Sequence, residues 1–141
     1  IDCPPSINNV IKSAFYASDF CLIPCVPSRM SIHGLELLLE KLRLFKKEYD
    51  HHITPMGTII SRYNGTNSQT HNLNFITVNP LLPPTFTIKI PERSKIAEGL
   101  DFDQQLTYKQ KYGDVHETMI ALAKEFMYRV DNSTGFQSVI A

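Results

Sequence analysis

The sequence has no excess of charge of either sign. Its 141 residues include 14 lysines and arginines and 14 aspartates and glutamates, so the formal net charge at pH 7 is zero with neutral histidines. A balanced chain produces no overall field that would attract nucleic acid or an acidic partner. Any charged binding site must therefore be local.

Long apolar runs are also missing. The sequence contains no run of about 18 apolar residues, and no charged segment leads into a short apolar one, as a membrane span or a signal peptide would require. We therefore expect a cytoplasmic protein without membrane attachment.

Cysteine is scarce. Cys3, Cys21 and Cys25 are an odd number of thiols in apolar surroundings, which favours buried thiols in a reducing compartment over a disulfide framework. The chain is 43% hydrophobic and 20% charged, which is enough apolar material for the core of one globular domain. We expect residues 1–141 to form that single domain.

Helix-like and strand-like hydrophobic patterns alternate in the first half of the chain. A helix is expected to run through Phe15, with Pro5 in its first turn or, as a less favoured start, Ser6 or Asn8. The apolar run Phe20–Val26 is typical of a strand buried on both faces of a parallel sheet. The spacing of apolar residues in Ser31–Tyr49 predicts an amphipathic helix with Ser31 as its N-cap.

The same alternation continues in the second half. We expect strands at Met56–Tyr63 and Phe86–Ile90, and a helix at Asp114–Val130 in which Asp114 and Glu117 have the spacing of a capping box. Strands that alternate with helices predict the α/β class, with a mostly parallel sheet flanked by helices.

Ligands of such sheets bind at the carboxyl ends of the strands. Four segments are expected there: the surroundings of Asp2, then 24–29, 61–65 and 91–99. The segment between Asn64 and Phe86 is rich in Asn, Pro and β-branched residues, which disfavour helix. A short helix before Pro80, a strand at Asn74–Val78 and an ordered loop all remain open for it.

The histidines do not support a metal site. His51 and His52 are adjacent, so on a strand their side chains would point apart, and no cysteine or carboxylate stands at ligand spacing. His33 precedes Gly34 on a predicted helix, where packing or capping is a better interpretation than general-base catalysis.

Residues 1–42 combine several features in a particular order. The sequence "IDCPPS" places an aspartate, one residue and two prolines ahead of a helix, and Asp19, the strand end Ile23-Pro24 and Gly34 follow. This segment resembles the ParA-type partition ATPases, the ParA and MinD class with a deviant Walker A motif, from their Walker B strand onward.

Two later stretches extend the resemblance to about residue 130. "GTIISRYNG" resembles the next strand of the family, and "IKIPERSKIAEG" resembles the Ile-Pro-Arg stretch that passes the nucleotide base. The resemblance implies the P-loop NTPase-like fold and the C-terminal portion of a longer ATPase. No Gly-x-x-x-x-Gly-Lys-Ser/Thr motif occurs in the sequence, so the phosphate-binding half would lie outside it, and we do not expect this chain alone to hydrolyse ATP.

The resemblance also implies roles for individual residues, with ATP and Mg²⁺ as cofactors. Asp2 would be the catalytic carboxylate that holds magnesium through water. Ser61 and Arg62 would approach the base, as would Pro91 and Glu92, where Glu92 replaces the arginine usual in the family.

Lys95 stands where the family often has a basic residue that contacts DNA phosphates. For any one of the basic residues, a solvated surface charge is the simpler interpretation. The same interpretation holds for Arg29, Lys46, Lys47, Lys109 and Lys111.

As a partition ATPase, the complete protein would form an ATP-dependent homodimer on nucleoid DNA without sequence preference. A ParB-like partner would stimulate hydrolysis, and the cargo would be a plasmid or a chromosome. One alternative is a MinD-like membrane-cycling ATPase, which normally ends in a basic amphipathic helix. The stretch "DNSTGFQSVIA" argues against it, because it carries no lysine or arginine and is too short to form a membrane face. The other is a non-catalytic dimerisation or docking module of the same fold.

Overall fold

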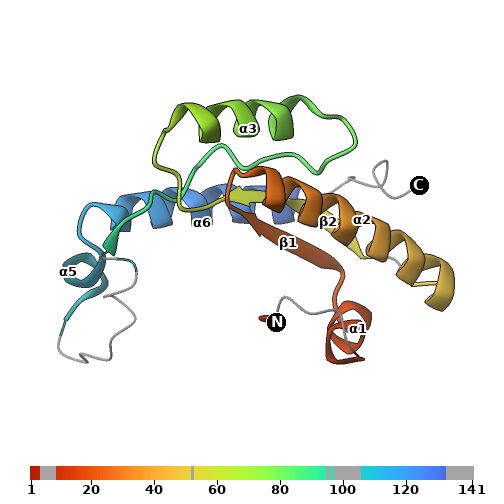
Figure 1. Ribbon diagram of the computed structural model, residues 1–141. Helices are drawn as coiled ribbons and strands as arrows, with labels where there is room; N and C mark the ends of the chain where they lie inside the picture. The colour runs from red at the N-terminus through yellow and green to blue at the C-terminus, as the bar shows by residue number, and fades with distance from the viewer. Residues whose placement is uncertain (4–8, 52, 95, 97–105, 133–141) are drawn as a thin grey trace.

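The computed structural model describes residues 1–3, 9–51, 53–94, 96 and 106–132. Helices and strands alternate from α1 to α3 (Figure 1), as the sequence pattern predicts for the first half, but the elements described after α3 are helices alone. The elements are α1 (Asn9–Tyr16), β1 (Phe20–Cys25), α2 (Arg29–Tyr49), β2 (Thr54–Ile60), α3 (Asn67–Val78), α5 (Tyr108–Tyr112) and α6 (Val115–Asp131). Several positions named in the predictions lie outside the described residues, among them Pro5, Lys95 and 97–99.

The strands β1 and β2 form a parallel pair connected through α2. Phe20 is paired with Thr54 at one end and Cys25 with Ile60 at the other, with one irregularity in the register after Cys21. The predicted α/β class with a parallel sheet is therefore confirmed for the described part of the chain.

The segment 85–91 runs beside β2 without forming the strand expected at Phe86–Ile90. Two isolated parallel bridges, Thr58 to Thr85 and Tyr63 to Pro91, mark its ends. Between them, the N–H groups of Thr87 and Ile88 donate to the carboxylate of Glu125. The prediction of a continuous strand was wrong because a side chain of α6 takes N–H groups from the centre of the segment.

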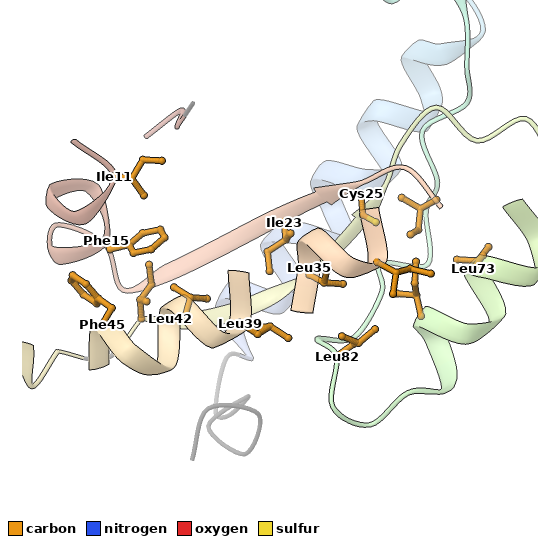
Figure 2. Packing of buried hydrophobic residues seen from close by; sticks show 14 residues of the cluster. Ile11, Phe15, Ile23, Cys25, Leu35, Leu39, Leu42, Phe45, Leu73 and Leu82 are labelled. Atoms are coloured by element: carbon orange, nitrogen blue, oxygen red, sulfur yellow. The ribbon is translucent and has the colours of Figure 1, made fainter. Parts of the chain in front are cut away.

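Helices pack on both faces of the sheet. The larger apolar cluster joins α1, α2 and α3 to one face, and Figure 2 shows Leu35 of α2 beside Ile23 of β1 and Leu42 near Phe15 and Phe45. On the other face, α6 packs against a second cluster, formed by Met56, Ile59 and Phe86. The sheet is therefore the middle of three layers.

The strand β1 is buried on one face only. Ile23 and Cys25 are buried among the helices of the larger cluster. Phe20 is 38% exposed and Leu22 39% exposed. The prediction that both faces of this apolar run are covered was wrong, since the described residues leave the Phe20 and Leu22 side partly open.

The helix α2 begins earlier than predicted. Its N-cap is Ser28, whose hydroxyl accepts from the backbone N–H of Ser31, so the expected N-cap Ser31 lies inside the first turn. At the start of α6, Asp114 makes no capping hydrogen bond with its side chain. Its carboxylate instead lies 3.8 Å from Nε of Arg93, so the predicted capping box was wrong.

The segment 64–86, for which the sequence left three conformations open, contains α3. The short helix before Pro80 is therefore confirmed, and the alternative strand at Asn74–Val78 is wrong. Thr66 caps the helix by accepting from the N–H of Gln69. Leu73 and Ile76 are buried, and the buried Asn72 donates to the carbonyl of Pro27. Tertiary packing therefore overrides the weak helix propensity of this composition.

The three cysteines have different environments, and all are free thiols. Burial raises the pKa of Cys21 to about 12 and also raises the pKa of Cys25. Cys3 is exposed, which corrects the expectation that all three thiols are buried.

Candidate nucleotide site

The carboxyl end of β2 continues into a loop whose backbone is hydrogen-bonded to the end of β1 on one side and to the segment 90–92 on the other. The N–H of Ser61 donates to the carbonyl of Cys25 at 2.9 Å. On the other side, Tyr63 donates to the carbonyl of Ile90 at 3.0 Å, and Glu92 donates back to the carbonyl of Tyr63 at 3.2 Å. These bonds bring the two predicted base-contact segments, 61–62 and 91–92, to the same edge of the sheet.

Arg62 and Glu92 meet at this edge. The guanidinium of Arg62 donates to one carboxylate oxygen of Glu92 from Nε at 3.2 Å and from Nη2 at 2.8 Å. Asn64 donates from its side-chain amide to the other oxygen at 3.2 Å. The hydrogen bond from Arg62, with the further bond from Asn64, lowers the pKa of Glu92, so this carboxylate is ionised at neutral pH.

The backbone at Arg62 is held in the left-handed region, with φ of 50°. This conformation is uncommon for residues other than glycine. Gln69 fixes it from α3, because its side chain accepts from the N–H of Asn64 at 2.8 Å and donates to the carbonyl of Arg62 at 3.0 Å. The first turn of α3 therefore positions the Arg62 loop.

Asn64 and Gln69 are the two residues of this cluster that the sequence did not single out. The sequence placed Asn64 only within the segment 61–65 at the carboxyl end of a strand, and it indicated no partner for the side chain. The contact between Asn64 and Glu92 spans 28 residues, so it depends on the tertiary fold and not on a local motif.

Asp2 lies apart from this cluster. It is exposed, and it lines an apolar cavity together with Pro24 at the end of β1. Ser61, Arg62, Pro91 and Glu92 are not among the residues that line this cavity. The structure thus brings four of the predicted site residues together and leaves Asp2 on a separate surface.

The chemistry of Asp2 fits a magnesium ion that is held through water. An exposed carboxylate can accept hydrogen bonds from metal-bound water, and Mg²⁺ usually retains several waters. Across the described ranges, no three His, Cys, Asp or Glu side chains gather in a way that would hold a metal directly.

The basic residues near this edge are already engaged. Nζ of Lys89 lies 5.6 Å from the centre of the Tyr63 ring, and Arg93 faces Asp114. Lys95, the predicted DNA contact, falls outside the described residues, so its role stays a prediction.

Comparisons with known proteins support the resemblance of this sequence to the ParA-type ATPases. Residues 1–55 match the family model of an AAA domain. The chromosome partitioning protein ParA of Myxococcus xanthus is 22% identical over 129 residues, which is 92% of this chain and 46% of that protein. An uncharacterised protein of Pseudomonas putida is 23% identical over 129 residues, or 92% of this chain and 49% of the relative.

A shorter match covers 65 residues, with 32% identity, of an uncharacterised protein of Methanocaldococcus jannaschii. It includes 45% of this chain and 25% of that protein. The chain thus spans at most about half the length of these curated relatives. The match at residues 1–55 and the 22% identity to ParA over 92% of the chain show that this chain is similar to the ParA-type ATPases, and they agree with a P-loop NTPase-like fold.

Proposed function

We propose that this chain is part of a DNA-partitioning ATPase and supplies two elements of its nucleotide site. The observation that carries the proposal is the similarity to the ParA protein of Myxococcus xanthus, which extends over 92% of the chain. In the complete protein, ATP would bridge two subunits, the dimer would bind DNA without sequence preference, and a ParB-like partner would stimulate hydrolysis.

Asp2 would act on the phosphate side of the nucleotide. Its carboxylate would accept hydrogen bonds from waters on the magnesium ion and so orient the ion against the phosphates. The bound Mg²⁺ would neutralise charge that develops on the phosphoryl oxygens during transfer. The phosphate-binding loop itself would come from outside this chain, since the sequence contains no such motif.

The cluster at the end of β2 would contact the base. Pro91 is bridged to Tyr63, so its backbone lies at a fixed position on the edge. Ser61 and Arg62 precede this bridge, and Glu92 holds the guanidinium of Arg62. A guanidinium plane held by a carboxylate can stack on a purine ring while its charge remains partly neutralised.

A dimerisation or docking module without catalysis is the second candidate. The observation that favours it is the pairing of Glu92 with Arg62, because both carboxylate oxygens and two guanidinium nitrogens already have partners within the protein. In that case, the edge at the carboxyl end of β2 would be a rigid docking surface and would not bind the nucleotide base.

ATP-dependent assembly on DNA separates the two candidates. We expect the natural protein that contains this chain to dimerise with ATP and Mg²⁺ in light-scattering measurements, and to bind duplexes of unrelated sequence with equal affinity. The affinity should fall steeply with salt because the contacts are to phosphates. A dimer that forms equally well without nucleotide and does not bind DNA would favour the docking module.

A further inference from the structure

The first turns of α3 and α5 carry the same pattern, a threonine followed three residues later by a glutamine. Thr66 and Thr107 are the N-caps, and the hydroxyl of each accepts from the backbone N–H of its glutamine, Gln69 or Gln110. In a complete capping box, the glutamine side chain also reaches back to the N–H of the threonine. The two helices therefore show what the same residue does at the same position in two places.

The capping box is complete in α5 but not in α3. In α5, Oε1 of Gln110 accepts from the N–H of Thr107 at 2.9 Å. In α3, the N–H of Thr66 donates instead to Oδ1 of Asn64 at 3.3 Å. The side chain of Gln69 is therefore not needed at the cap of its own helix.

Gln69 uses both ends of its amide on the loop that precedes α3. Oε1 accepts from the N–H of Asn64 at 2.8 Å, and Nε2 donates to the carbonyl of Arg62 at 3.0 Å. The loop turns at Arg62, where φ is 50°. Residues other than glycine seldom adopt this left-handed conformation without support from their surroundings. Two hydrogen bonds from one side chain thus hold the turn.

The helix that carries Gln69 is itself fixed in place. One turn further along, the buried side chain of Asn72 donates to the carbonyl of Pro27 at 3.3 Å. Leu73 and Ile76 of the same helix are buried in the larger apolar cluster. Gln69 therefore acts on the loop from a packed element, which holds a side chain more precisely than a loop would.

The turn at Arg62 determines where its side chain lies. In an extended strand, successive side chains point to opposite faces, and the left-handed residue ends this alternation. The guanidinium then donates to Glu92 on the neighbouring segment at 2.8 Å. Without Gln69, the backbone of Arg62 would move to the conformations that are common for its residue type, and the contact with Glu92 would be lost for part of the time.

We propose that Gln69 is a positioning residue that sets how much the base contributes to nucleotide affinity. It would act through Arg62 and would not touch the nucleotide. This inference rests on the proposed function, because it requires the base to lie at the carboxyl end of β2. The contacts to phosphate and magnesium, which would come from Asp2 and from outside this chain, should not depend on Gln69.

Two ligands separate the base from the phosphates. In the natural protein that contains this chain, calorimetry would compare ATP with tripolyphosphate, which has three phosphates and no base, both with Mg²⁺. Gln69→Met keeps the length of the side chain and removes both hydrogen bonds. We expect it to weaken ATP binding about three- to tenfold, as when the competent loop is populated between about a third and a tenth of the time. Tripolyphosphate binding should not change.

Gln110→Met is the matched control. It removes the glutamine side chain from the same position of α5, and it leaves the loop at Arg62 untouched. Both affinities should stay as they are in the natural protein. Urea denaturation of the two variants measures any general loss of stability, which would not change the ratio of the ATP and tripolyphosphate affinities.

The conformation of Arg62 can also be followed without nucleotide. Its backbone ¹³C chemical shifts report φ and ψ, and Gln69→Met should move them away from left-handed values, whereas Gln110→Met should not. Unchanged shifts in Gln69→Met, or equal weakening of ATP and tripolyphosphate binding, would overturn the role of Gln69. If the natural protein binds ATP no more tightly than tripolyphosphate, the base site of the proposed function fails, and the role of Gln69 fails with it.

Discussion

The carboxylate of Glu125 accepts the backbone N–H of Thr87 with both oxygens, at 2.8 and 3.0 Å, across 38 residues of sequence. The same carboxylate accepts from Ile88 at 3.1 Å and from Arg129, one turn further along α6, at 2.8 Å. Arg129 in turn donates to the carbonyl of Thr85 at 2.7 Å. One pair of charged side chains thus satisfies the polar backbone where the segment 85–91 leaves β2.

We expect Glu125→Ala to destabilise the fold by about 1.5 to 3 kcal/mol, because it leaves two backbone N–H groups and Arg129 without their carboxylate. Urea denaturation measures this change. The control is Glu117→Ala near the start of the same helix, where the side chain is 77% exposed and the expected loss is below about 0.5 kcal/mol. Equal losses for the two variants would show that Glu125 is not a specific anchor.

The same carboxylate predicts a loss of stability in acid. Burial raises the pKa of Glu125, but the hydrogen bonds from Thr87, Ile88 and Arg129 outweigh it, and the net pKa is lowered. A carboxylate whose pKa is lower in the folded state stabilises the fold above its unfolded pKa of about 4.3, and this contribution is lost as the pH falls through the folded pKa. Between neutral pH and acid, Glu125→Gln should therefore lose less stability than the natural chain.

Gly57 and Gly34 make a matched pair for a third prediction. A Cβ at Gly57 would lie 2.6 Å from Nη1 of Arg129 and 2.7 Å from the carbonyl of Pro84, and its φ of 153° is unfavourable for other residues. Gly57→Ala should cost about 2 kcal/mol or more through overpacking and backbone strain. Gly34→Ala, in an open position inside α2, should stabilise by about 0.5 to 1 kcal/mol. The two midpoints in urea should move in opposite directions, and movement in the same direction would contradict this packing.

The contact between Arg62 and Glu92 predicts coupled effects on nucleotide affinity. In the natural protein, Arg62→Ala should weaken ATP binding about three- to tenfold by removing a cation from the base site. Glu92→Ala should weaken it similarly, because Arg62 loses the partner that holds it. In a double-mutant cycle, the two losses should not add. Fully additive losses in calorimetry would mean that the two residues act independently.

The sequence predicted the parts of this fold that have a strong local pattern. The apolar spacing of Leu35, Leu39 and Leu42 identified α2, and their burial confirms it. The apolar run at Phe20–Val26 and the alternation of elements likewise identified β1 and the parallel arrangement. The order of residues in 1–42 led to the family that the comparisons support.

The parts that were missed depend on contacts between distant residues. The segment 85–91 has the composition of a strand, but its N–H groups bond to Glu125 on α6. Asn72 joins α3 to the loop before α2 through the carbonyl of Pro27, which no helix propensity predicts. Asn64 and Gln69 belong to the candidate site only because the fold brings Glu92 and α3 to the end of β2.

The role of Asp2 is the central claim and has the most direct test. Calorimetry would compare ATP binding with and without Mg²⁺ in the natural protein that contains this chain, in its Asp2→Asn variant, and in Asp131→Asn, which changes an exposed aspartate at the end of α6. We expect Asp2→Asn to weaken magnesium-dependent binding by about 10- to 100-fold, as loss of an outer contact to a metal usually does, with no change for Asp131→Asn. Magnesium-dependent affinities that are the same in all three proteins would contradict the account.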